Sequence, residues 1–190
     1  LIQKGTNLLK DKITLTSDEI RMHTHALFLQ RYKTILIGEK YPYDAVDAVL
    51  SVNIDSLLDI RQKVIALSDL KKQPYFEHLA ITFRRVVSIL NEESDGDIQT
   101  SLFNEPSEKK LYDEYKRIKE PAENHLRKKQ FSQALEKIVE IKKTVDEFFE
   151  HTMVMTKEDA LRKNRLRLLK HICLLFSNIA DFSKIVLKKT

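Results

Sequence analysis

The stretch TKEDALRKNRLRLLKHICLLFSNIADFSKIVLKK, residues 156–189, contains no glycine and no proline. Its apolar residues recur at helical spacing, and Thr156 precedes Asp159 in an arrangement that resembles a capping box. This pattern predicts one long terminal helix with an apolar face and an opposite basic face. The apolar face carries Leu161, Leu168, Ile172, Leu175 and Ile179, and the basic face carries Arg162, Lys163, Arg167 and Lys170.

Arg165 interrupts this division, because the same geometry places it at the edge of the apolar face. A guanidinium in that position must be paired or must line a cavity, since an unpaired buried charge is costly. Asp146 and Glu147 are the nearest acidic candidates in the preceding helical segment. We therefore expect a structural ion pair between Arg165 and one of them.

The composition predicts an all-α protein. The chain has 190 residues, 42% of them hydrophobic, with only 3 Gly and 4 Pro. The predicted helices cover residues 16–37, 42–50, 55–72, 75–90, 104–121 and 131–149, with a capping box at Thr16, an end at Gly38, Asp55 as a cap and a break or kink at Pro121. We expect a helical segment over residues 1–73 that links to a longer parent chain, and a helical bundle over residues 74–190.

Cysteine content and hydropathy limit the cellular setting. Cys173 is the single cysteine, which excludes an internal disulfide framework and favours a reducing compartment such as the cytoplasm. No stretch resembles a signal peptide or a membrane span. The chain begins LIQKG without an initiator Met, so we suspect a piece of something longer.

Motifs of catalysis are lacking in the sequence. There is no Gly-rich phosphate loop, no GxSxG and no HExxH. His23 and His25 are two residues apart, which points them in different directions on a helix and disfavours a metal pair. We expect no catalytic residue, no cofactor and no metal in this chain.

Basic clusters predict a binding surface instead. The net charge is +5, and cations gather at Arg84 and Arg85, in residues 116–119 and 127–129, and above all in residues 162–170. Splayed RNA bases stack on aromatic or guanidinium planes while Lys and Arg hold phosphates. The competing interpretation is that these runs are solvated helix faces. Candidate stacking partners are His151, Tyr112, Phe149 and Tyr115.

Three separated motifs resemble one family. The run VDEFFEHTMVMTKEDALRKNRLRLLKHI, residues 145–172, is similar to the carboxy-terminal end of the β subunit of bacterial two-subunit glycyl-tRNA synthetases, with Thr152 where that family usually has Val. EKYPYDAVDAVL, residues 39–50, and ITFRRVVSIL, residues 81–90, resemble two further stretches of it, with Ser88 in place of Asn. Residues 159–162 spell the DALR signature of the anticodon-binding domain shared with arginyl-tRNA synthetases.

The resemblance implies a non-catalytic helical module that docks on the anticodon stem-loop of glycine tRNA. The active site, ATP and Mg²⁺ would then belong to the complete α2β2 enzyme, whose α subunit is the implied protein partner. The expected RNA contacts are Arg84, Arg85, His151, Arg162, Lys163, Arg167 and Lys170, with the turn at residues 151–155 near the anticodon bases. Two alternatives stay open: the corresponding domain of an arginyl-tRNA synthetase, and a helical protein-interaction module without RNA specificity.

Overall fold

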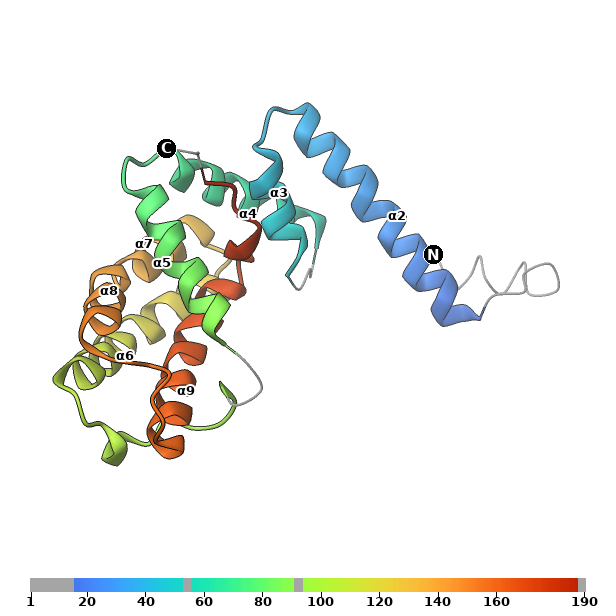
Figure 1. The fold of residues 1–190 in the computed structure, drawn as a ribbon. Helices are drawn as coiled ribbons and strands as arrows, with labels where there is room; N and C mark the ends of the chain where they lie inside the picture. The colour runs from blue at the N-terminus through green and yellow to red at the C-terminus, as the bar shows by residue number, and fades with distance from the viewer. Residues whose placement is uncertain (1–15, 53–55, 91–93, 188–190) are drawn as a thin grey trace. The chain divides into compact units, whose positions relative to one another are not determined.

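A computed structural model describes residues 16–52, 56–90 and 94–187, and every regular element in these ranges is a helix (Figure 1). The expectation of an all-α protein is therefore confirmed. Contacts divide the chain into two compact units, residues 1–41 and residues 42–190.

The first unit contains α2 (Ser17–Gly38). Its start is the predicted capping box, in which the Glu19 N–H donates to the Thr16 hydroxyl at 3.2 Å and the Thr16 N–H donates to the Glu19 carboxylate at 2.7 Å. The Glu19 pKa is lowered because its carboxylate accepts from the backbone and the side chain of Thr16. Both predicted ends of this helix are confirmed.

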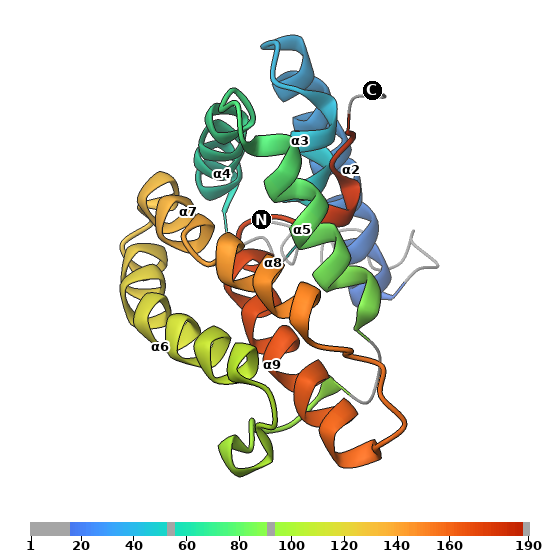
Figure 2. The ribbon, with the colours of Figure 1, turned by 60° about the vertical axis from the view of Figure 1, so that its left-hand side comes forward.

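The second unit is built from helices of 8 to 22 residues and two short 3-10 helices. α6 packs against α7, α8 and α9, and α5 packs against α8 and α9 (Figure 2). α4 contacts α3, α5 and α7. The elements are α3 (Tyr43–Leu50), α4 (Leu57–Lys71), α5 (Phe76–Ile89), η2 (Thr100–Leu102), α6 (Pro106–Arg127), α7 (Phe131–Val139), α8 (Lys142–His151), α9 (Asp159–Ser177) and η3 (Phe182–Lys184).

An aromatic cluster lies at the centre of this unit. Phe83 of α5 stacks on Phe176 of α9, with ring centroids 4.4 Å apart, and Phe182 of η3 meets both rings edge-on. All three side chains are buried, and each fully buried aromatic ring contributes several kcal/mol, of the order of 3, to the free energy of unfolding. The cluster therefore fixes the C-terminal segment against α5 and α9.

The prediction of one long helix over residues 156–189 was wrong at both ends, because α9 covers only Asp159–Ser177. The N-cap is Glu158 rather than Thr156, because the Asp159 carboxylate bonds forward to Arg162 and Lys163 and so does not cap backwards. At the other end, the Asn178 side-chain amide donates to the Leu174 carbonyl at 2.8 Å. This bond supplies a donor to one of the last four carbonyls of the helix, and α9 ends at Ser177. The predicted apolar face is nevertheless buried throughout.

Three further boundaries differ from the predictions. α6 continues through Pro121 without a break, because the flanking Ile118 and Ala122 are buried against neighbouring helices. The single helix predicted over residues 131–149 is two, α7 and α8, since the chain turns tightly at Glu140 while Ile141 is buried. The cap predicted at Asp55 lies outside the described residues, and the helix that follows has Ser56 as its N-cap.

The C-terminal segment joins α3 to the bundle. The Asp181 N–H donates to the Ala48 carbonyl at 2.9 Å, and the Val186 N–H donates to the buried Asp44 carboxylate at 2.9 Å. Asp44 also pairs with Lys71. The functional division predicted between residues 73 and 74 stays a prediction.

Candidate nucleic-acid interface

The start of α9 holds two of the predicted cations. Arg162 and Lys163 both pair with Asp159, the latter at 2.8 Å. The hydrogen bond from Lys163 and the charge of both cations lower the Asp159 pKa. Arg162 is also half-buried and donates to the Thr156 carbonyl. Both cations therefore pair with the Asp159 carboxylate in the first turn of α9 and remain partly exposed to solvent.

Arg167 and Lys170 fasten a neighbouring loop to α9. The Arg167 Nε donates to the Asp95 carbonyl at 3.0 Å, and the Lys170 Nζ lies 3.9 Å from the Asp95 carboxylate. His171 bonds to the Gly96 carbonyl at 3.2 Å. Gly96 has a φ of 113°, and a Cβ there would lie 3.1 Å from the Arg167 Nε, so this position favours glycine. The RNA contacts predicted for Arg167 and Lys170 stay predictions.

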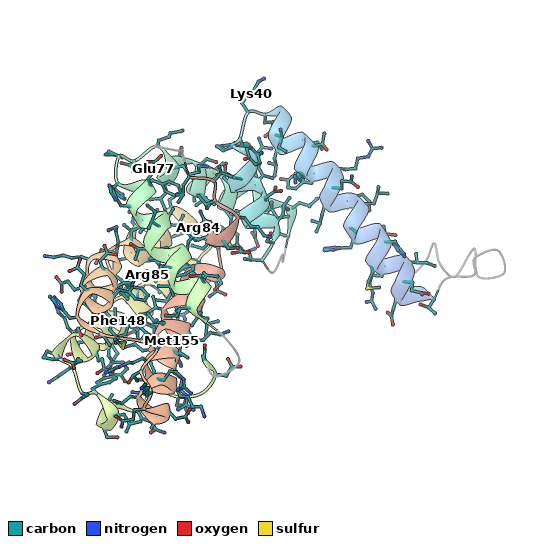
Figure 3. All side chains as sticks on the ribbon, viewed as in Figure 1. Lys40, Glu77, Arg84, Arg85, Phe148 and Met155 are labelled. Atoms are coloured by element: carbon teal, nitrogen blue, oxygen red, sulfur yellow. The ribbon has the colours of Figure 1, made fainter. Side chains whose placement is uncertain are left out.

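Arg84 and Arg85 differ from the cations of α9. Both are exposed on α5, where Figure 3 shows them in succession along the helix. Within the described part of the chain, neither arginine has a carboxylate partner. The Arg85 guanidinium carbon lies 4.0 Å from the centroid of the Phe149 ring, in contact with the ring face. Phe149 is buried and Arg85 is exposed, so the ring supports the guanidinium from the protein side while solvent reaches the arginine.

The end of α8 and the turn after it lie next to the start of α6. His151 is exposed and lines a 660 Å³ hollow with Pro106 and Glu147. Met153 and Met155 of the following turn are 76% and 52% exposed. Figure 3 places Met155 on the segment that leads into α9.

Arg165 is paired, as expected, but the predicted partner was wrong. Its Nε donates to the Glu108 carboxylate at 3.0 Å, and its Nη1 donates to the Met153 carbonyl at 3.0 Å. Both members of the pair are buried, with side chains 5% and 1% exposed. The predicted partners are engaged elsewhere: Asp146 bonds to Thr82 and Lys142, and Glu147 pairs with Lys110.

Glu108 is the residue that sequence reasoning missed. Burial acts to raise its pKa, but hydrogen bonds from Arg165 and from the backbone N–H groups of Glu105 and Asn104 outweigh it, so the pKa is lowered. This carboxylate therefore stays ionised and fixes the start of α6 to α9. Only its position two residues after Pro106 could have marked it, as an acidic residue in a first helical turn.

The predicted residues thus fall into three places. Arg84, Arg85 and His151 lie on α5 and at the end of α8, whose buried Phe149 supports Arg85. Arg162 and Lys163 lie at the start of α9, and Arg167 and Lys170 lie against the loop at residues 94–97. Tyr115 and Phe149, two of the expected stacking partners, are 5% and 9% exposed and so offer little ring surface to a base.

The described ranges contain neither a metal-binding cluster nor a membrane-spanning helix. No group of three His, Cys, Asp or Glu side chains there could hold a metal ion. None of the helices in those ranges is both long enough and apolar enough to span a membrane.

The helical bundle and its signature identify the class of domain. Residues 79–186, more than half of the chain, match the model of the DALR anticodon binding domain, and the chain belongs to that family.

Three similar proteins are all beta subunits of glycine–tRNA ligases. Over 185 residues the chain is 36% identical to the glycine–tRNA ligase beta subunit of Trichlorobacter lovleyi and 33% identical to that of Geotalea daltonii. It is 33% identical over 186 residues to the same subunit of Syntrophus aciditrophicus. These matches cover 97–98% of this chain and 27% of each relative, so the chain spans about a quarter of their length.

Proposed function

We propose that this chain is the anticodon-recognition part of a glycine–tRNA ligase β subunit and docks on the anticodon stem-loop of glycine tRNA. Family membership supports binding of an anticodon, and the relatives favour glycine over arginine as the amino acid. The complete enzyme would join glycine to tRNA at the expense of ATP with Mg²⁺, on residues outside this chain, together with its α subunit in the cytoplasm.

The observation that carries the proposal is the state of Arg85. Its guanidinium lies over the Phe149 ring, its side chain is exposed, and no carboxylate of the described ranges neutralises it. A guanidinium held over a ring in this way can bind a phosphate or stack on an unpaired base. Arg84 beside it adds a second exposed cation. Together they form the most available positive surface among the predicted contacts.

A second part of the proposed surface lies at the end of α8 and in the turn after it. His151 is exposed and lines a hollow with Pro106 at the start of α6, and Met153 and Met155 of the following turn are exposed. An RNA loop crossing α5 and the end of α8 would meet cations, an imidazole and polarisable thioethers in sequence. Methionine side chains adapt to irregular surfaces, which suits contact with splayed bases.

Binding of a 17-nucleotide anticodon hairpin of glycine tRNA, followed by fluorescence anisotropy, tests the proposal. Arg85→Gln should weaken binding by about tenfold, the range of a lost stacking or charged contact. Arg117→Gln is the matched control, because Arg117 is also exposed but is held by Glu114 and Glu140. Equal affinities for wild type and Arg85→Gln would remove this surface from the interface.

A further inference from the structure

A second hollow opens at the start of α6, about 470 Å³ in volume. Its walls include Phe103, just after η2, and Tyr112, in the second turn of α6. Asn104, Lys109 and Asp113 contribute polar groups to its lining. The volume is several times that of a nucleobase, so a base and part of its ribose can enter.

The walls offer aromatic surface. The Phe103 and Tyr112 rings lie 5.5 Å apart at an interplanar angle of 62°, and both side chains are half-buried. The Lys116 ammonium lies 5.5 Å from the Tyr112 centroid and adds a positive charge beside the ring. Unpaired bases stack on such rings, and nearby cations attract the adjoining phosphates.

The polar lining is available for hydrogen bonding. Asn104, Lys109 and Asp113 are exposed, and none of their side chains has a partner in the described part of the chain. An ionised Asp113 only accepts hydrogen bonds, whereas Asn104 both donates and accepts. A carboxylate at a base edge favours an exocyclic amino group, as in cytosine N4, and disfavours a carbonyl oxygen at the same position.

Buried polar residues of α9 hold the wall in place. The Asn164 amide accepts from the Gln99 N–H at 2.7 Å and donates to the Gln99 carbonyl at 2.9 Å. Arg165 holds Glu108, whose carboxylate accepts from the N–H groups of Asn104 and Glu105 at 2.8 and 2.7 Å. Hydrogen bonds from Asn164 therefore fix the start of the segment at residues 99–105, and hydrogen bonds to Glu108 fix its end. A buried ion pair adds little to stability on average, so its use here is to position this wall.

The hollow adjoins the surface already assigned to RNA. Glu105 and Pro106 line both this hollow and the one that reaches His151. The Ser107 and Thr152 hydroxyls are hydrogen-bonded at 2.6 Å, which ties the start of α6 to the turn after α8. A loop that contacts His151 can therefore place a neighbouring base against Phe103 and Tyr112.

We propose that this hollow receives one unpaired RNA base that carries an exocyclic amino group. The base stacks against the Phe103 and Tyr112 rings, and its amino group donates to Asp113. Lys109 and Lys116 hold the adjoining phosphates. Asn164 and Arg165 act as positioning residues that keep the wall in place. The inference rests on the proposed function, because it assigns a base of the same bound loop.

The test uses the 190-residue chain and anticodon hairpins in which each loop cytosine is replaced in turn by pyrimidin-2-one, which lacks only the amino group. Wild type should lose about tenfold in affinity at one position, the size of a charge-assisted hydrogen bond. Asp113→Ala, which leaves no acceptor at this position, should bring the two affinities there to within about twofold of each other. Tyr112→Leu should weaken binding about tenfold and Tyr112→Phe should not, because the phenylalanine ring still stacks.

The controls separate failure of the hollow from failure of RNA recognition. Tyr75→Leu removes an exposed tyrosine elsewhere, 43% exposed at the start of α5, and should leave binding unchanged. Thermal melting of every variant checks the fold. Wild-type affinity in Tyr112→Leu, together with a loss in Arg85→Gln, would overturn the base site and leave the proposed function standing. Wild type that ignores the anticodon altogether would overturn both.

Discussion

Replacing Glu108 by Gln tests the clamp between α6 and α9. The substitution keeps the shape of the side chain but removes the charge that pairs with Arg165, which is 5% exposed. Four hydrogen bonds of 2.7 to 3.3 Å end on this carboxylate, and an amide cannot accept all of them. Breaking a buried pair by removing one partner costs about 3–5 kcal/mol. We take about 3 kcal/mol as the expected loss.

The assay is urea and thermal unfolding followed by circular dichroism at pH 7. For a domain of this size, a loss of about 3 kcal/mol lowers the Tm by roughly 6–12 °C. Glu114→Gln, which removes a surface partner of Arg117, should cost less than about 1 kcal/mol. Glu108→Gln combined with Arg165→Met should regain part of the loss, because no buried charge is then left unpaired. A single Glu108→Gln variant within about 0.5 kcal/mol of wild type would refute the clamp.

Three further predictions concern charge and acidity. Arg84→Gln should weaken hairpin binding and reduce the slope of log affinity against log salt by about one, and an unchanged slope would mean that Arg84 meets no phosphate. Folding lowers the Glu108 pKa, so this carboxylate contributes fully to the free energy of unfolding above its ordinary pKa of 4.5, and the contribution is lost as the pH falls through the folded pKa. Unfolding measured at several pH values should therefore show the stability difference between wild type and Glu108→Gln shrinking below pH 4.5. A difference that stays constant would contradict this. Burial raises the pKa of Cys173, so iodoacetamide at pH 8 should alkylate it about tenfold more slowly in the folded chain than in urea, and equal rates would contradict the burial.

Arg165 illustrates how far the sequence could lead. Its phase on the helix was enough to predict that it is buried and paired, because a lone buried charge is too costly. Its partner could not be predicted, since Glu108 lies 57 residues earlier and only the packing of α6 against α9 brings them together. Sequence proximity favoured Asp146, which instead bonds to Thr82.

The ends of α9 show the same limit. Apolar periodicity continues to Ile179, which is buried although it lies beyond the helix. The helix stops earlier, at Ser177, where the Asn178 side-chain amide donates to the Leu174 carbonyl of the last turn, a bond that periodicity does not reveal. Element type was predictable from pattern, whereas the boundary depended on local side-chain bonds.

Charge counting was the least specific guide to the site. It favoured Arg167 over Arg85, although Arg167 is held against the loop at Asp95 and Arg85 is exposed on Phe149. The difference lies in contacts between residues more than 60 positions apart in the chain. A run of basic residues therefore predicts only that a surface is positive, and the fold decides which of these side chains are free of protein partners.

The central claim is tested most directly by comparing two hairpins at low and moderate salt. One carries the anticodon loop of glycine tRNA, and the other has the cytosines at the second and third anticodon positions replaced by uracil. We predict that the replacement weakens binding at both salt concentrations, because base contacts survive screening that weakens phosphate contacts. Equal affinities for the two hairpins at both concentrations would contradict recognition of the anticodon.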